Sequence, residues 1–499
     1  MKPKHIKKVL MSEINKVANN PKDYCFHPDT DFTRKRKISM KAVLTGIIGM
    51  GSGSLTNELI DFFHASPQMP TPSAFLQQRS KIKPEAFRSI FDGFNETITK
   101  GFSEKMPIFA VDGSDIQIAT NPGDTGSYYP GSNGQKGYNL LHLNALYEID
   151  YHIYADSIIQ KSKNCNEHKA LQKMVDRSTI PEALIIADRG YESYNSMAHI
   201  QEKGWYFLIR IKDGHGSIKS NLELPKEKLF DLKINLNITR KQSKEVKELL
   251  KDKNHYRYLP SNVNFDYLPA KSNYKDPASF YGLSFRIARF QISEDTYETV
   301  LTNLDKEQYP LEKLKQLYAL RWGIETSFRD LKYTIGMLDF HSKKVMCIQQ
   351  EIYAHLIMYN FAEMITSYVV IEKKQRKYTY KANFSVASHF INGILGAMSV
   401  MFIGIWIGKQ LDLESTISIG AVVTTMDIIS FTRIGKKTVN AKAMSNKTVA
   451  AKLFVYGLEK NDVLIPTCGF GDYLYYAMWI SGTHALSTSG IAYASVTWF

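Results

Sequence analysis

Cysteine is scarce in this 499-residue sequence, and its four cysteines are far apart. They are Cys25, Cys165, Cys347 and Cys468. No pair has the Cys-x-x-Cys or Cys/His spacing of a zinc site, and no disulfide framework is indicated. The N-terminal stretch MKPKHIKKVLMSEINK has no apolar core, so it does not resemble a secretory signal. A reducing, cytoplasmic location is therefore the expectation.

Acidic residues are also few relative to basic ones, with 49 Asp and Glu against 63 Lys and Arg and a formal net charge of +14. This excess attracts polyanions, of which nucleic acid is the commonest. A merely soluble basic protein is the alternative. With 44% hydrophobic residues the chain is globular, and its length favours two or three domains.

Long apolar runs are nearly absent. The uncharged run from Ile391 to Gly408 has 18 residues, at the lower edge of a membrane span, and contains Asn392 and four glycines. A buried helix fits this composition better, so we do not expect a membrane protein.

The first 100 residues predict a helical, basic unit. Ser39 suits the cap of a helix through Met50, and a second helix covers about 55–63. In PTPSAFLQQRSKIKPEAFRSIF, Ser73 suits an N-cap and Pro84 a first helical turn. Two short helices joined by a tight turn predict either a DNA-reading element or an ordinary helical hairpin. The candidate DNA contacts are Gln77, Gln78, Arg79 and Lys81.

From Met106 the pattern becomes β-rich. The apolar run 107–111 stops at Asp112-Gly113-Ser114, and the run 183–187 stops at Asp188-Arg189-Gly190-Tyr191. Between them, 138–149 and 151–160 predict two strands around a tight turn, and about 166–177 predicts a helix. Two strands therefore each end on an aspartate, although an Asp-Gly pair alone also fits ordinary turn chemistry.

Residues 212–310 predict a separate β-rich insertion. Apolar residues alternate with polar ones over 232–239, and strand-like runs return at 283–290 and 297–304. The lysine-rich stretch 240–257 fits either a solvated segment or a DNA-backbone contact.

Helical periodicity runs from Leu311 to about Gly336. One polar stripe of this helix carries Tyr318, Arg321, Glu325 and Lys332. The neighbouring apolar stripe carries Leu317, Leu320, Ile324, Phe328 and Leu331. A plain ion pair between Arg321 and Glu325, four residues apart, is the alternative interpretation.

Taken together, Asp112, Asp188 and Glu325 make an oxygen-only set suited to Mg²⁺, with Mn²⁺ possible. Two such ions, roughly 3.5–4 Å apart, activate a nucleophile and stabilise a leaving oxygen at phosphorus. Tyr318, Arg321 and Lys332 would then meet DNA phosphates beside the scissile bond. Asp115, three residues beyond Asp112, is expected in a loop or next to the ligands.

These motifs resemble those of bacterial insertion-sequence DDE transposases of the cut-and-paste type. LYALRWGIETSFRDLK looks like their Tyr-Arg-Glu-Lys signature, Asp188-Arg-Gly-Tyr191 like their second aspartate motif, and VDGS at 111–114 like the first. FTRKRKISM, SLTNELIDFF and PTPSAFLQQRSKIKP are similar to their DNA-binding region. The resemblance extends from about residue 30 to about residue 390.

The resemblance implies an α/β, RNase H-like (retroviral-integrase-like) core with an inserted β-rich subdomain. It implies a helical DNA-binding domain at 1–100, the core at 101–211 and 311–390, the insertion at 212–310 and an atypical tail at 391–499. It also implies two Mg²⁺ ions, terminal inverted repeats and target DNA as substrates, a hairpin intermediate, a homodimer and a bacterial, nucleoid-associated location. The tail departs from the family, which suggests a frameshifted or fused coding end. The alternative is a catalytically silent, transposase-derived DNA-binding protein.

Overall fold

The computed structural model describes residues 3–34, 38–63, 66, 69–100, 105–132, 134–212, 216–269 and 280–367. The described residues fall into two units, one containing residues 3–31 with 82–367 and the other residues 32–81. In the first unit, α1 (Pro3–Ala18) packs against α6 (Pro84–Thr99) and α12 (Val345–Thr366). Residues 1–31 and 82–100 thus group with the sheet, in contrast to the expected N-terminal domain of residues 1–100.

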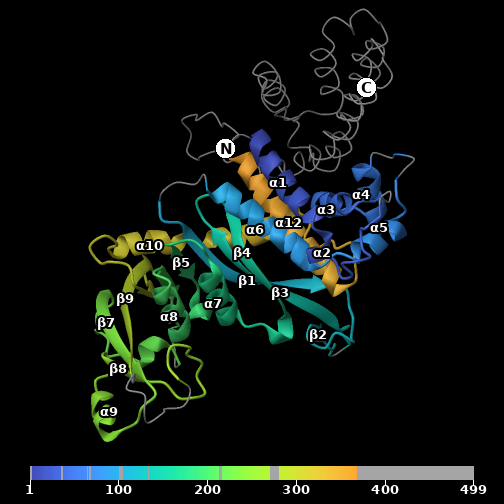
Figure 1. The fold of residues 1–499 in the computed structure, drawn as a ribbon. Helices are drawn as coiled ribbons and strands as arrows, with labels where there is room; N and C mark the ends of the chain where they lie inside the picture. The colour runs from blue at the N-terminus through green and yellow to red at the C-terminus, as the bar shows by residue number, and fades with distance from the viewer. Residues whose placement is uncertain are drawn as a thin grey trace, which may run out of the picture. The chain divides into compact units, whose positions relative to one another are not determined.

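The first unit is built on one mixed sheet, which has ten strands in the described ranges and the order β2-β3-β1-β5-β6-β10-β9-β7-β8, with β4 also paired to β3 (Figure 1). The strands are β1 (Ile108–Ile118), β2 (Tyr128–Tyr129), β3 (Tyr138–Glu148), β4 (Ile153–Lys161), β5 (Leu184–Ala187), β6 (Tyr206–Arg210), β7 (Phe230–Thr239), β8 (Tyr256–Tyr258), β9 (Tyr281–Ser293) and β10 (Thr296–Thr302). β1, β5 and β6 run parallel, whereas β3 pairs antiparallel with β1. The prediction of a mixed α/β protein is confirmed.

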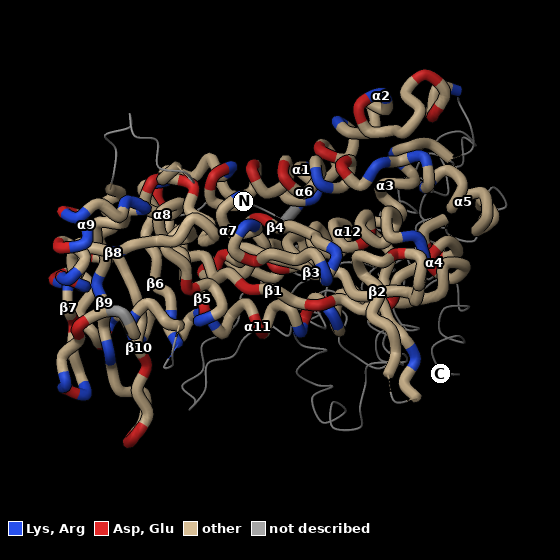
Figure 2. The backbone as a smooth tube through the Cα atoms, turned by 90° about the horizontal axis from the view of Figure 1, so that it is seen from below, with Lys and Arg blue, Asp and Glu red and all other residues tan. Residues whose placement is uncertain are grey.

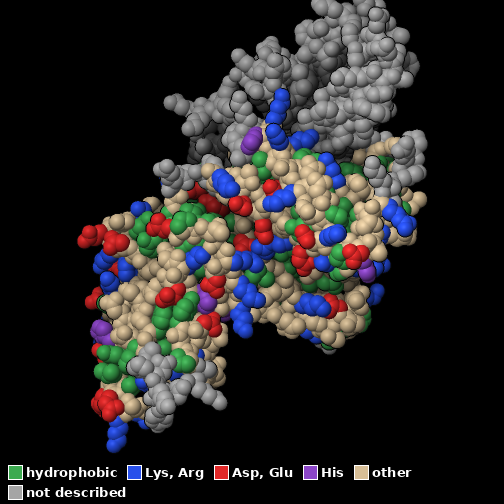
Figure 3. All heavy atoms as spheres, viewed as in Figure 1, with side chains coloured by type: hydrophobic (Ala, Val, Ile, Leu, Met, Phe, Trp, Pro, Cys, Tyr) green, Lys and Arg blue, Asp and Glu red, His purple; other side chains and the backbone are tan. Residues whose placement is uncertain are grey.

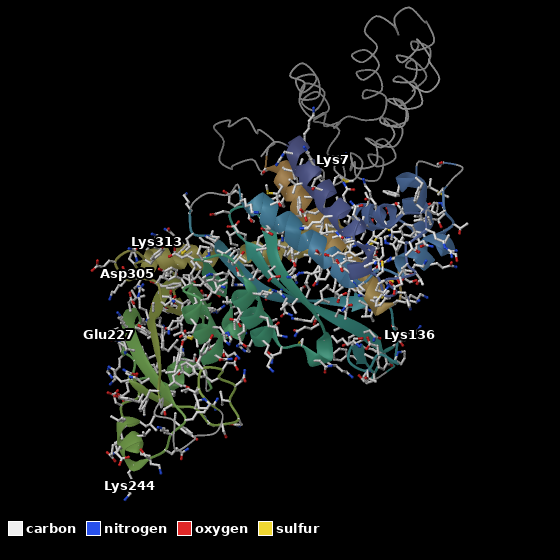
Figure 4. The ribbon with its side chains drawn as sticks, viewed as in Figure 1. Lys7, Lys136, Glu227, Lys244, Asp305 and Lys313 are labelled. Carbon is white, nitrogen blue, oxygen red and sulfur yellow. The ribbon has the colours of Figure 1, made fainter. Side chains whose placement is uncertain are left out.

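The strands predicted within 212–310 extend this sheet. β10 pairs antiparallel with β6, with Val300 opposite Arg210, and β9 and β7 follow in order. The β-rich composition is confirmed, but the segment is not separate at the level of the sheet, because the β6–β10 ladder joins it to the strands that carry the aspartates. The lysine-rich stretch forms α9 (Lys244–Leu249) and β8, and Lys244 lies at the end of this region farthest from α10 (Figure 4).

Helices cover both faces of the central strands. Val111 and Ala187 belong to a core cluster with residues of α7 (Glu167–Arg177) and α8 (Tyr194–Glu202). Ile186 belongs to another with Tyr318 of α10 (Leu311–Ala319). Figure 2 shows α7 and α8 on one side of the strands and α11 (Trp322–Arg329) on the other. Successive residues of β1 and β5 therefore face opposite helix layers, as the alternation of side chains along a strand requires.

The helices of the second unit begin directly after residues whose side chains cap them. In α3 (Met40–Gly49) the Ser39 hydroxyl accepts from the Ala42 amide, as predicted. α4 (Leu55–Phe62) is also where the sequence predicts a helix. In α5 (Pro72–Arg79) the cap is Thr71 and not Ser73, because Pro72 takes the first helical position, where its missing N–H leaves no bond unmade.

None of the helices in these ranges has the length and apolarity needed to cross a membrane. The apolar run 391–408 and the atypical tail 391–499 lie outside the described residues.

Candidate active site

Asp112 and Asp188 each follow one of two paired residues on neighbouring parallel strands. Val111 of β1 pairs with Ala187 of β5, and one aspartate follows each of them. Because Val111 and Ala187 face the α7 and α8 layer, the next side chain on each strand faces the layer of α10 and α11. Adjacent strands lie about 4.8 Å apart, so the two aspartates are neighbours on one face of the sheet.

Only one of the two predicted strand ends exists. β5 stops at Ala187, and Asp188 caps a short 3-10 turn by accepting from the Gly190 amide at 2.7 Å. β1 continues past Asp112 to Ile118, so the predicted strand end at Asp112 is wrong. The reason is that β1 keeps its antiparallel partner β3 after its parallel partner β5 has stopped. Asp115 accordingly lies within β1 and not in a loop.

The pKa of the Asp112 carboxyl is raised to about 6. Burial is the largest cause, and the charges of Asp188 and Glu325 raise the pKa further, whereas the Gly113 amide and Arg321 lower it. Both other predicted acidic residues are thus close enough to perturb Asp112. This crowding of like charges is the arrangement that a cation would relieve.

Glu325 lies on α11 and forms an ion pair with Arg321, with 2.7 Å between Oε1 and Nη1. The side chain of Glu325 is 37% exposed, whereas that of Arg321 is 9% exposed. The ion pair considered from the sequence is therefore present. It joins the partly exposed glutamate to a buried guanidinium.

The continuous helix predicted over 311–336 is interrupted. α10 ends at Ala319, α11 begins at Trp322, and a π-helical turn spans Asp330–Thr334. At the break, the Leu320 and Arg321 amides donate to carbonyls three residues back. Leu320, assigned to the apolar stripe, is consequently 38% exposed.

The three predicted phosphate contacts on this segment have different surroundings. Tyr318 is buried in the core cluster with Leu184 and Ile186, so its side chain is not available to DNA in this structure. Arg321 packs its guanidinium 5.9 Å from the centre of the Tyr318 ring. Lys332 is partly exposed and donates to the Asp115 carbonyl at 2.9 Å.

The four candidate DNA contacts of the N-terminal region lie in or next to α5. Gln77 is exposed, and Lys81 donates to Gln78 at 3.2 Å. Arg79 is fully buried because it shares the inner face of α5 with Phe75, so it does not face solvent. Among these four, Gln77 is the most accessible.

Three carboxylates offer the hard oxygen donors that Mg²⁺ or Mn²⁺ takes, so the donor types fit such an ion. In the described ranges, no group of three or more His, Cys, Asp or Glu side chains is close enough together to hold a metal ion. Glu325 does not complete such a group because its carboxylate is engaged in the ion pair with Arg321.

A histidine between two carboxylates was missed by the sequence reasoning. His142 Nδ1 lies 2.8 Å from Asp115 Oδ1, and His142 Nε2 lies 3.0 Å from Glu167 Oε1. Burial lowers the pKa of His142, but the two carboxylates outweigh burial and raise the pKa above its ordinary value. The signal in the sequence was a pair of polar residues, His142 and Asn144, inside the otherwise apolar strand 138–149.

A family model described as "Transposase DDE domain" matches residues 103–361, which is more than half of the chain. This chain belongs to the DDE transposase family. The matched range contains Asp112, Asp188 and Glu325, together with His142 and Glu167.

Two further comparisons concern this transposase as a whole. A solved structure titled "Cryo-EM structure of piggyBac transposase synaptic complex with hairpin DNA" is similar to it with a TM-score of 0.43 and 9% sequence identity, covering 85% of this chain and 84% of that chain. A search of curated proteins finds no match.

Proposed function

We propose that this transposase cleaves DNA at the ends of an insertion sequence and joins those ends to target DNA. Asp112, Asp188 and Glu325 would hold the divalent ions, two Mg²⁺ or Mn²⁺, on a retroviral-integrase-like core. The observation that carries the proposal is that Asp112 and Asp188, which follow paired residues of adjacent strands, lie together with Glu325 inside the range matched by the DDE transposase family model. The raised pKa of Asp112, caused first by burial and then by the charges of Asp188 and Glu325, supports it.

Bound ions would activate a water or a 3′-hydroxyl as the nucleophile and stabilise the charge of the leaving oxygen in an in-line attack at phosphorus. The contribution of the chain is positioning. Asp112 and Asp188 are fixed by adjacent strands, whereas Glu325 is free to turn once Arg321 releases it. A DNA phosphate is a competing partner for Arg321, since guanidinium binds phosphate as well as carboxylate. Binding of DNA would thereby free the third carboxylate.

The partners of this reaction are double-stranded DNA with terminal inverted repeats and a target duplex, and a second copy of the chain in a homodimer. The net charge of +14 supports binding to DNA. Lys332 and Arg321 would contact phosphates beside the cleaved bond, with Tyr318 supporting Arg321 from the core. Gln77, with Gln78 and Lys81, would contact the inverted repeats. We expect these events at the bacterial nucleoid.

The test uses the full chain and a DNA fragment that carries the sequences flanking its gene. Asp112→Asn, Asp188→Asn and Glu325→Gln are each expected to lose Mg²⁺-dependent cleavage by at least about a hundredfold while binding the fragment as well as the unaltered protein. Asp295→Asn, in the exposed turn between β9 and β10, is the matched control and should cleave normally.

The same assay distinguishes the proposed function from the alternative. A catalytically silent DNA-binding protein would bind the fragment and show no metal-dependent cleavage in any form. Cleavage that persists in one of the three variants would remove that residue from the site.

A further inference from the structure

Asp115, His142 and Glu167 form a connected group that we call the carboxylate–histidine cluster. Its members come from β1, β3 and the first residue of α7. Asp115 lies directly opposite His142 in the antiparallel register, and Glu167 lies on the other side of the imidazole. His142 is 8% exposed, so the imidazole bridging the two carboxylates is largely shielded from water.

The cluster packs against the glycine that follows Asp112. A Cβ atom at Gly113 would lie 2.3 Å from His142 Nε2 and 2.5 Å from Glu167 Oε1, far closer than real contacts. Only a residue without a side chain lets the cluster approach β1 at this point. The backbone on the C-terminal side of Asp112 is therefore held directly by the cluster.

Glu167 also lies beside the turn that carries Asp188. Its Oε2 would be 3.9 Å from a Cβ atom at Gly190, in ordinary van der Waals contact. The Gly190 amide is the group that donates to Asp188 Oδ1 at 2.7 Å. One carboxylate thus lies near the backbone next to both aspartates.

The segment that carries Glu325 is linked to the cluster through Lys332. Its Nζ donates to the Asp115 carbonyl at 2.9 Å. Lys332 belongs to the π-helical turn that directly follows α11, the helix of Glu325. Three segments far apart in sequence therefore meet at one group of side chains.

We propose that the carboxylate–histidine cluster sets the relative positions of Asp112, Asp188 and Glu325. Its members are positioning residues, since they lie beside the backbone of the acidic segments and, within the described ranges, form no hydrogen bond to the three carboxylates. Because this inference names the support of the proposed site, it rests on the proposed function. Small displacements of reacting groups are enough to lower rates about a hundredfold, so such support has a large effect.

The protein contains a matched control for this cluster. His199 on α8 is also buried between two carboxylates, with Nδ1 2.8 Å from Asp176 Oδ1 and Nε2 2.9 Å from Asp266 Oδ2. Both of its carboxylate partners lie outside the segments that carry the three acidic residues. His142→Gln and His199→Gln each remove an imidazole that lies between two carboxylates.

The first measurement is hydrogen–deuterium exchange of the full-length variants. We expect His142→Gln to speed exchange together in 108–118, 188–193 and 330–337, with His199→Gln leaving these segments as in the unaltered protein. Faster exchange confined to the neighbours of His142 in β3 and α7 would overturn the proposal. If His142→Gln does not fold, Glu167→Gln, whose side chain is 35% exposed, carries the same expectation.

The second measurement is single-turnover cleavage of the fragment carrying the flanking sequences. His142→Gln should lower the rate roughly 10- to 100-fold with unchanged DNA affinity, whereas His199→Gln should cleave at the normal rate. Equal rates in the two variants would overturn a positioning role. If the unaltered protein and Asp112→Asn cleave equally, the proposed function fails instead, and the exchange pattern still decides whether the cluster links the three segments.

Discussion

Asp112 destabilises the fold at neutral pH because its buried carboxyl must ionise away from water, and beside Asp188 and Glu325. Its folded pKa of about 6 exceeds the unfolded value of 3.8, so the penalty is absent below pH 3.8, grows as the pH rises and is complete above about 6. The shift corresponds to about 3 kcal/mol, and partial exposure to solvent reduces this to about 1–2 kcal/mol.

We therefore expect Asp112→Asn to raise the free energy of unfolding by about 1–2 kcal/mol at pH 8 without divalent ions, and by almost nothing near pH 4. Urea unfolding at both pH values measures the difference. Asp295→Asn is the control, and an equal gain there would contradict the argument.

Gly113 gives a second expectation at the residue scale. Gly113→Ala should lower the free energy of unfolding by about 1–3 kcal/mol, because the new methyl group overlaps His142 and Glu167. Gly282→Ala in β9 is the control, since nothing lies within 4 Å of its Cβ position. Urea unfolding that finds both variants as stable as the parent would mean that the cluster does not press on β1.

At the scale of residues, the sequence is a better guide to candidate active-site residues than to the contacts that they make. Asp112 and Asp188 could be selected because an apolar run precedes each of them, and this pattern reflects local burial. The bridge between Asp115, His142 and Glu167 could not, because it depends on the register of β1 with β3 and on the placement of α7. The burial of Tyr318 and Arg79 likewise depends on neighbours far away in sequence.

At the scale of elements, a buried ion pair holds the strands that lead to α10. Arg286 of β9 donates to Asp231 of β7 through Nε and Nη2, at 3.0 and 2.6 Å, and also to the carbonyls of Leu304 and Tyr309. The two charged side chains are 5% and 7% exposed. The pair joins β7 and β9 to the connection before α10.

Removing one partner of a buried pair leaves a charge without compensation. Asp231→Ala is therefore expected to cost about 3–5 kcal/mol in chemical unfolding. Glu298→Ala breaks the more exposed pair with Arg210, at 3.3 Å, and should cost less than about 1 kcal/mol. Similar losses in both variants would argue against a special role for the buried pair.

The sequence predicts these elements well and their connections less well. β3, β5, α3 and α7 follow from periodicity and caps, which are local. The break between α10 and α11 has no proline to mark it and only Gly323 beside it, and it arises where the amides of Leu320, Arg321, Gly323 and Ile324 bond three residues back. The joining of residues 212–310 to the main sheet depends on the β6–β10 ladder, which only long-range pairing determines.

At the scale of the whole molecule, the net charge of +14 predicts DNA affinity that falls steeply with salt. Acidic and basic side chains are interspersed on the face in Figure 3, so the excess is not gathered into one patch there. Raising salt from 50 to 200 mM should weaken binding by at least about tenfold, measured by fluorescence anisotropy. A dissociation constant independent of salt would contradict binding through phosphates.

The order in which the strands occur along the chain has a consequence for synthesis. β1, β5 and β6 leave the ribosome long before β10, which pairs with β6 in the sheet, and before α11. A nascent or prematurely terminated polypeptide thus holds two of the three acidic residues and lacks the last until most of the core has been translated. Under the proposed function, unfinished products cannot cut the genome of the cell that makes them.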